Sequence, residues 1–262
     1  MGFHKIILDI SIPLFDELAA GSDFESVAKG RIGNHLVSTG EQGIPVVRTT
    51  TQYNIPANDF STQHHKIVAY INEAVSREGL SAIPLLQFNN ALIEVYDETY
   101  WKMNYHSDQC LDIEDDTYIG VFSCYEHPDA LTAQHMRKLK MKDKATGDES
   151  EYALTHHSVI LFSTATNKQF QHKIVLDAAP NPKSTVPDNR WLGITFRVSK
   201  TYLRFKDGLP CFTDGSQLIL ADKEQASIFY KLRGQENSSL DFEYPPLNFT
   251  VNPADLMLPV KR

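Results

Sequence analysis

Two closely spaced polar residues, His106 and Asp108 in "NYHSDQC" (104–110), raise the first question about chemistry. An imidazole and a carboxylate are both metal ligands, and in an extended segment these two side chains project to the same face. His172 lies in a second strand-like segment, "QFQHKIVLD". Two histidines and one carboxylate hold Fe(II) and leave coordination positions open. The three residues therefore predict a metal site; the alternative is a polar pair on a solvated strand.

Arg197 is the next residue with possible chemistry, because it stands among strand-forming apolar residues in "WLGITFRVSK". A buried guanidinium without a partner is unfavourable, so something anionic is expected to meet it. One candidate is the distal carboxylate of 2-oxoglutarate, which an arginine fork can grip at two points. The other is an internal ion pair with an Asp or a Glu.

Six other histidines are not expected to bind the metal. One adjacent pair falls on a helical segment, where neighbouring side chains point about 100° apart, and we expect it on a solvated face. A second adjacent pair precedes a strand and would point to opposite faces. The last two fall in a charged insertion, 126–153, which is long enough to form a lid. The helical pair is His64 and His65, the pair before the strand is His156 and His157, and the two in the insertion are His127 and His135.

The elements that must position these residues fall into two groups. Apolar spacing predicts an amphipathic helix within 58–80, with Asp59 or Ser61 as its N-cap and Gly79 just past its end. Weaker helices are expected at 11–20 and 23–29, and a late helix at 222–237. From residue 82 the chain changes to short segments rich in Val, Ile, Phe, Tyr and Thr. These predict strands at 91–97, 101–107, 117–125, 157–164, 169–177, 191–199 and 201–205.

This order of elements predicts an α+β fold: a double-stranded β-helix, or jelly roll, with N-terminal helices packed against it. We expect one domain over 1–262, with a helical N-terminal part (1–81), the jelly-roll core (82–205) and a C-terminal extension (206–262). The extension ends in a Pro-rich segment from Tyr244 that is expected to run over the surface.

Composition narrows the classes of partner. The net charge of −8 argues against tight, sequence-independent binding of long nucleic acid. One basic cluster, "RKLKMKDK" at 137–144, is interpreted as a solvated loop or as a loop that contacts phosphate. The apolar runs are too short for a membrane span, and no secretory signal is evident. Three cysteines without a CxxC predict a reducing, cytoplasmic setting.

The order His106-x-Asp108, His172 and Arg197 resembles the Fe(II)/2-oxoglutarate dioxygenases, and most closely their AlkB-like branch. "EVYDETYWKMNYHSD" is similar to that branch's strand leading into the iron site. "HHSVILFSTATNKQFQH" resembles its run to the distal histidine, and "NRWLGITFR" its closing arginine strand. The resemblance covers roughly 91–205.

The resemblance implies a role for each matching residue. His106, Asp108 and His172 become Fe(II) ligands, Arg197 a clamp for the 2-oxoglutarate carboxylate, and Tyr96 a hydrogen-bond donor to this cosubstrate. The branch has a second arginine where this chain has Trp191, and Arg190 is offset by one residue, which reverses the facing side unless a bulge restores it. Glu94 stands where the branch usually has an amide. Ser199 matches the Arg-x-Ser of other 2-oxoglutarate enzymes.

The resemblance also implies the reaction: 2-oxoglutarate and O2 are consumed, succinate and CO2 are released, and a C–H bond is hydroxylated. We expect a small-molecule or nucleotide-like substrate, because the chain is acidic. Alternatives are an AlkB-like dealkylase of nucleic acid or protein, and a non-catalytic jelly-roll binding module. In "GIPVVRTTTQYNIP" (43–56), Arg48, Thr50 and Tyr53 are candidate substrate contacts, unless this segment is an edge strand and turn. The sequence does not indicate an oligomeric state.

Overall fold

The main sheet carries most of the strands that the sequence predicts. The computed structural model describes residues 2–177 and 188–261. Seven strands follow one another by antiparallel pairing, and β5 (Asn58–Asp59) adds to β3 in parallel. The order across the sheet is β1 (Phe3–Ile7), β10 (Ser158–Ser163), β7 (Tyr118–Tyr125), β12 (Trp191–Arg197), β6 (Asn90–Tyr96), β3 (Arg31–Val37) and β2 (Glu25–Ala28).

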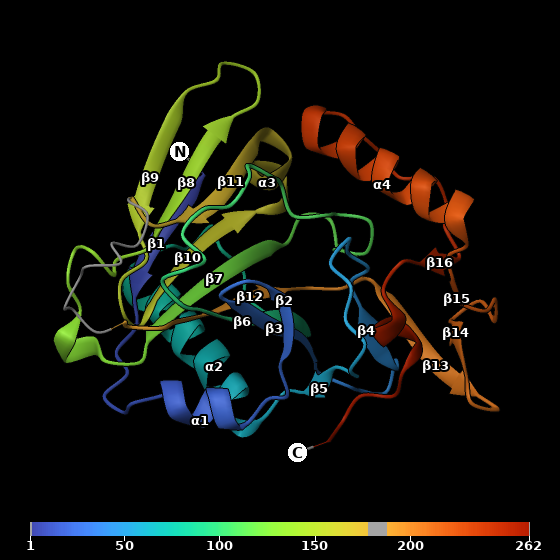
Figure 1. Cartoon of the computed structure of the whole chain (residues 1–262), viewed down its shortest axis with the longest axis horizontal. Coiled ribbons are helices and arrows are strands. Elements are labelled where there is room, and N and C mark those ends of the chain that lie inside the picture. The colour runs from blue at the N-terminus through green and yellow to red at the C-terminus, as the bar shows by residue number, and fades with distance from the viewer. Residues whose placement is uncertain (1, 178–187, 262) are drawn as a thin grey trace.

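A second, three-stranded sheet lies over one face of the main sheet, at the upper left of Figure 1. It pairs β11 (Phe170–Val175) with β8 (Lys138–Asp143), and β8 with β9 (Glu149–Ala153). Apolar residues of both sheets form a single buried cluster, in which Leu139, Met141 and Ile174 of the small sheet meet Val121 and Ile160 of the main one. Two antiparallel sheets thus share one core.

The opposite face of the main sheet is covered by helices α1 (Phe15–Ala20) and α2 (Thr62–Arg77), seen below the sheet in Figure 1. The buried stripe of α2, which includes Ile67, Ile71 and Ala74, packs into a second and larger apolar cluster. Ser61 is the N-cap of α2, and the Nδ1 atom of His64 accepts a hydrogen bond from the Ser61 backbone N–H at 2.9 Å. The amphipathic helix predicted for this region is confirmed.

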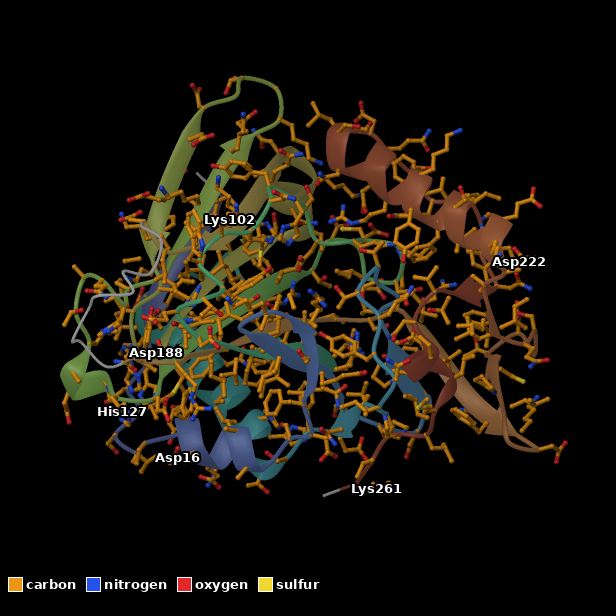
Figure 2. The ribbon with its side chains drawn as sticks, viewed as in Figure 1. Asp16, Lys102, His127, Asp188, Asp222 and Lys261 are labelled. Atoms are coloured by element: carbon orange, nitrogen blue, oxygen red, sulfur yellow. The ribbon has the colours of Figure 1, made fainter. Side chains whose placement is uncertain are left out.

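The C-terminal part adds smaller elements. β13 (Thr201–Lys206) pairs with β14 (Leu209–Phe212) and with β4 (Ile44–Val46), and β15 (Ile219–Leu220) pairs with β16 (Phe249–Thr250). Short helix α3 (Thr164–Gln169) links β10 to β11. Helix α4 (Lys223–Ser238) begins at Asp222, labelled in Figure 2, whose carboxylate accepts the Gln225 N–H. Among the helices in the described ranges, none is long and apolar enough to cross a bilayer.

The α+β prediction with antiparallel sheets is confirmed, but four local predictions are wrong. Segment 23–29 forms strand β2, because it pairs with β3, and residues 1–81 contribute β1 to β5 as well as helices. Segment 101–107 is irregular apart from one bridge at His106. Segment 137–144 is largely a strand, β8, and the insertion at 126–153 supplies β8 and β9 to the second sheet.

Candidate metal centre

His106 and His172 are brought together by the backbone. His106 lies in the irregular segment between β6 and β7, and its N–H donates to the His172 carbonyl at 3.0 Å. The His172 N–H donates back to the His106 carbonyl at 2.6 Å. This double bridge at the edge of β11 sets the two imidazole rings 4.7 Å apart between centroids. The main-chain bridge therefore holds the two histidines side by side.

Asp108 is placed by a side-chain amide from α3. Its backbone N–H donates to Asn167 Oδ1 at 2.8 Å, and Asn167 Nδ2 donates to the Asp108 carbonyl at 2.8 Å. The Asp108 carboxylate then has one oxygen, Oδ1, at 3.6 Å from His172 Nε2. One possible donor atom from each of Asp108, His106 and His172 lies within 4.8 Å of the others. The three side chains can reach one ion.

The protonation states suit a divalent metal. Burial, followed by the charge of His172, lowers the pKa of His106 to about 3, so its imidazole is neutral at pH 7. His106 Nδ1 lies 3.1 Å from the Asn104 carbonyl, to which only a protonated Nδ1 can donate, and this leaves the Nε2 lone pair available. Burial favours the neutral acid at Asp108, but Arg197 and His172 outweigh it and hold the pKa of Asp108 well below its usual range. Neutral imidazoles and an ionised carboxylate are the forms that bind metals.

Arg197 takes the other oxygen of the Asp108 carboxylate. Its Nε donates to Asp108 Oδ2 at 3.1 Å, and both side chains are nearly fully buried. Of the two partners considered for this arginine, the structure therefore forms the internal ion pair. The Nη1 atom of Arg197 is buried and has no hydrogen-bond partner among the described residues. One edge of the guanidinium remains available for another acceptor.

The three candidate metal ligands line a cavity of about 340 Å³. That volume lies within the usual range for small-molecule sites. Its wall includes all three candidate ligands together with Arg197, Tyr96, Thr50 and two arginines that the sequence did not single out, Arg31 and Arg233.

Arg31, on β3, forms an ion pair with Glu94 on β6. Arg31 Nε donates to Glu94 Oε1 at 2.6 Å, and the hydroxyl of Tyr96 donates to Glu94 Oε2 at 2.7 Å. Arg31 Nη1 also donates to the Tyr100 hydroxyl at 3.2 Å. A glutamate in place of the branch's usual amide is thus balanced by an arginine from the neighbouring strand. An unpaired Glu94 on a buried strand was the one signal that could have predicted such a cation.

Arg233 comes from the C-terminal turns of α4. Its Nη2 donates to the carbonyl of Ser107, the residue between the two ligands of the irregular segment. Sequence reasoning missed it because α4 has a largely polar pattern, and no spacing indicates which face of α4 meets the cavity.

Four predicted site residues do not line this cavity. Arg190 lies on the surface, where its guanidinium donates two hydrogen bonds to Glu126, and the pairing of β12 with β6 has no bulge that would correct the one-residue offset. Ser199 Oγ donates to the Val46 carbonyl. Arg48 is paired with Asp112, and Tyr53 is fully buried with its backbone N–H bonded to Asn252. In this segment only Thr50 and its neighbour Thr51 reach the cavity wall.

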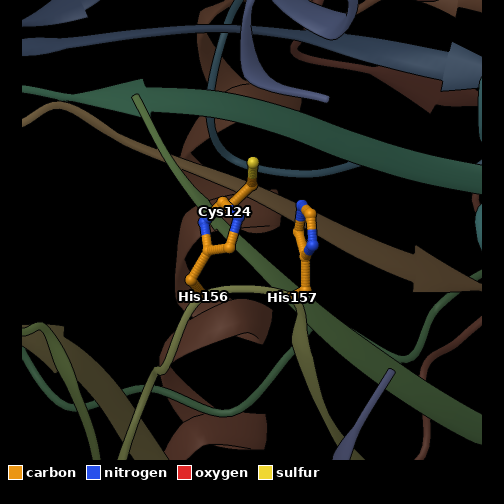
Figure 3. A group of neighbouring side chains, drawn as sticks. All are labelled: Cys124, His156 and His157. Carbon is orange, nitrogen blue, oxygen red and sulfur yellow. The ribbon is translucent and has the colours of Figure 1, made fainter. Parts of the chain in front are cut away.

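A second histidine cluster joins Cys124 of β7 to His156 and His157 (Figure 3). The two rings stack at 3.7 Å between centroids, so the prediction that they point to opposite faces is wrong. His156 Nδ1 accepts the Tyr125 N–H, and His157 Nδ1 lies 3.1 Å from the Ile10 carbonyl. Burial raises the pKa of the Cys124 thiol to about 12, which disfavours the thiolate that a metal requires. These contacts suit a structural role.

Two further expectations about surface groups need correction. His64 is buried, not solvated, because it packs against Phe60 and caps α2. The basic cluster at 137–144 is largely neutralised: Lys138 pairs with Glu151 and Asp177, and the Arg137 guanidinium is bonded to backbone carbonyls.

Solved structures that are similar to this chain include the following two. One is the structure of OsALKBH1, with a TM-score of 0.49, 17% identity, and coverage of 75% of this chain and 96% of that one. The other is a prolyl-4-hydroxylase from Pseudomonas putida, with a TM-score of 0.41, 12% identity, and coverage of 75% and 92%. No protein-family model and no curated protein matches the chain.

Proposed function

We propose that this protein is an Fe(II)- and 2-oxoglutarate-dependent oxygenase that hydroxylates a C–H bond of a small-molecule or nucleotide-like substrate. The observation that carries the proposal is the group of half-buried His106 with buried Asp108 and His172, whose donor atoms lie within 4.8 Å of one another beside an arginine. Two imidazoles and one carboxylate on one side of an ion leave positions for a cosubstrate and for O2.

The residues present fit a ferrous ion. His106 Nε2, His172 Nε2 and Asp108 Oδ1 are the atoms that would hold it, because His106 Nδ1 faces a carbonyl and Asp108 Oδ2 faces Arg197. When bound, the iron with 2-oxoglutarate and O2 supplies oxidative decarboxylation to succinate and CO2, coupled to oxygen transfer. The chain's own part is to hold the ligand set in its metal-binding protonation state.

Arg197 is the residue we propose for a carboxylate of 2-oxoglutarate. Its Nη1 is buried without a partner and the residue lines the cavity, so a carboxylate there gains a charge-assisted hydrogen bond. Tyr96 lies on the same wall, but its hydroxyl donates to Glu94 and so is not free to donate to a carboxylate of 2-oxoglutarate. Arg190 and Ser199 are not included, because their side chains do not line the cavity.

The proposal extends to the architecture. We propose that the main sheet and the β11-β8-β9 sheet are the two halves of a double-stranded β-helix, and that residues 1–262 are one domain. The shared apolar cluster between the sheets and the position of His172 on the small sheet support this arrangement. The metal centre then lies at the open end of the two-sheet core.

The test is Fe(II)-dependent formation of succinate from 2-oxoglutarate. We expect slow turnover even without the physiological substrate, and loss of both turnover and iron binding in His106→Ala. His65→Ala, which removes an exposed imidazole from α2, is the matched control and should retain both. Absence of iron binding and of turnover in the unmodified protein would contradict the proposal.

A further inference from the structure

The end of α4 is fastened to the segment that carries two of the three candidate ligands. Asn237 Oδ1 accepts the Ser107 N–H at 2.8 Å, and Glu236 Oε1 accepts the Cys110 N–H at 2.7 Å. Arg233, one turn earlier, donates through Nη2 to the Ser107 carbonyl. The C-terminal extension therefore places a guanidinium on the wall of the metal cavity.

Arg233 differs from the other two arginines of the cavity. Arg31 is bonded to Glu94 and Arg197 to Asp108, but Arg233 Nη1 is buried with no hydrogen-bond partner among the described residues. Its nearest carboxylate oxygen, Glu236 Oε2, is 3.7 Å away. That oxygen already accepts the Tyr244 hydroxyl at 2.6 Å. Arg233 thus brings a positive charge without a hydrogen-bonded anion.

We propose that Arg233 binds an anionic group of the substrate, a carboxylate or a phosphate, and so selects substrates that carry one. The inference rests on the proposed function, since it assigns the rest of the cavity to metal and cosubstrate. A guanidinium offers donors in a planar fork that matches both groups. The Arg233 side chain is 16% exposed and lines the cavity wall.

The charges of the cavity wall agree with an anionic ligand. Among the residues that line the cavity, two arginines are matched by two carboxylates and Arg233 is the third cation; Glu236, whose Oε2 lies 3.7 Å from Arg233 Nη1, is not part of the lining. A divalent ion adds two positive charges, and dianionic 2-oxoglutarate removes two. One positive charge then remains beside the bound cosubstrate, and a substrate anion would balance it.

The experiment measures anion preference directly. Protein loaded with Zn(II), which does not support turnover, and with 2-oxoglutarate is titrated calorimetrically with AMP and with N-acetylglycine. Adenosine and N-acetylglycinamide are the neutral counterparts. We expect the unmodified protein to bind at least one anion at least about tenfold more tightly than its neutral counterpart, the lower end of what a charge-assisted hydrogen bond contributes. AMP and N-acetylglycine separate a phosphate from a carboxylate source.

Variants assign the preference to one side chain. Arg233→Gln should abolish it, and Arg233→Lys should retain part of it. Lys231→Gln, which removes the same charge from an exposed position of α4, should leave it unchanged. An unmodified protein without any anion preference, or an Arg233→Gln protein that retains the preference in full, would overturn the proposal.

Separate titrations with the metal and with 2-oxoglutarate keep this proposal apart from the previous one. We expect Arg233→Gln to bind 2-oxoglutarate as the unmodified protein does. Because Arg233 also holds the Ser107 carbonyl, the metal affinity of the variant is measured first and the variant is saturated with Zn(II) before the anion titrations. Weakened binding of 2-oxoglutarate instead would make Arg233 a cosubstrate anchor and overturn the substrate role, while the oxygenase proposal would stand. If the unmodified protein binds neither metal nor 2-oxoglutarate, the oxygenase proposal fails, and the AMP and N-acetylglycine titrations of metal-free protein still decide the role of Arg233.

Discussion

The two oxygens of the Asp108 carboxylate have different neighbours, and this division explains how the buried charge is tolerated. Oδ2 is bonded to Arg197, and Oδ1 faces His172. In the protein without metal, Arg197 alone balances the carboxylate. With a divalent ion at Oδ1, the same carboxylate lies between two positive charges. Arg197 is therefore a positioning residue for the ligand as well as a candidate contact for the cosubstrate.

Replacing Arg197 with Met should destabilise the metal-free protein by about 3 kcal/mol, because it leaves a buried carboxylate without its partner. Zn(II) should restore part of this loss, since the ion replaces the missing positive charge. The free energy of unfolding, from urea titrations with and without Zn(II), is the measurement. Arg190→Met breaks an exposed ion pair and should change stability by less than about 1 kcal/mol. Equal losses in the free energy of unfolding of the two variants would show that the buried Arg197–Asp108 pair contributes no more to stability than an exposed ion pair.

At the scale of elements, the first turn of α2 buries His64, a residue that the sequence predicts to lie on a solvated face. His64 is buried at the third position of α2, where its Nδ1 accepts the Ser61 N–H. Burial, followed by the charge of His65, lowers the pKa of His64 to about 4. The imidazole is therefore neutral in the folded protein at pH values where the unfolded chain already takes up a proton.

This difference predicts a loss of stability on acidification. The stabilisation is fully present above the unfolded pKa of about 6.5 and is lost as the pH falls from there towards 4. His64→Gln removes the titrating group and retains an acceptor for the Ser61 N–H, as in a Ser-x-x-Gln capping box. Between pH 7 and pH 4.5 the variant should lose less stability than the unmodified protein, by about 1 to 2 kcal/mol. Urea titrations at both pH values test this; exposed His65→Gln should behave like the unmodified protein.

The end of α4 supports the metal-binding segment through Asn237. Its side chain accepts the Ser107 N–H at 2.8 Å, and its backbone carbonyl accepts the Gln171 side-chain N–H at 2.8 Å. We expect Asn237→Ala to weaken Zn(II) binding by about tenfold, the lower range for loss of a group that orients ligands. Amide exchange at Ser107 should accelerate in the same variant. Exposed Ser238→Ala is the control, and unchanged exchange at Ser107 in Asn237→Ala would argue against this support.

At the scale of the whole molecule, one buried ion pair connects three distant parts of the chain. Arg48 follows β4 and donates to both oxygens of Asp112, which precedes β7. The same guanidinium donates to the Leu247 and Phe249 carbonyls of the C-terminal segment. The segment from Tyr244, which the sequence predicts as a surface run, is therefore tied to the interior at these two carbonyls.

Arg48 was a candidate substrate contact in the sequence, and its contacts predict a different phenotype. Arg48→Met should lower the free energy of unfolding by about 3 to 5 kcal/mol, because the carboxylate of Asp112 is left buried and unpaired. Replacing both partners, in Arg48→Met with Asp112→Leu, should recover much of that loss. Affinity for Zn(II) should be unchanged in the double variant. A change in metal affinity without loss of stability would instead support a role in the cavity.

The parts of the fold that the sequence could predict are those decided locally. Strands β6, β7, β10 and β12 are continuous runs of strand-forming residues, and α2 has a clear apolar stripe. Segment 23–29 carries no such pattern: β2 is a strand because β3 offers it a partner, which a single segment cannot reveal. The same reason explains why residues 1–81 seemed mainly helical.

The residues of the candidate site also fall into two groups, those that the sequence could predict and those that only the fold brings to the cavity. His106, Asp108, His172 and Arg197 could be proposed together because ligand chemistry restricts residue type and the strands set the order. Arg31 and Arg233 reach the cavity through strand pairing and helix docking, and neither has a local signature. Arg190 and Ser199 show the opposite case. Their spacing fits a motif, but their side chains donate hydrogen bonds to Glu126 and to the Val46 carbonyl, outside the cavity.

The double backbone bridge between His106 and His172 affects the thermodynamics and the rate of metal binding at the proposed site. Main-chain hydrogen bonds and the Asn167 amide hold the backbone of His106, His172 and Asp108 in place. Little chain entropy then remains to be lost on loading, so capture of the ion should be limited by the removal of its hydration shell.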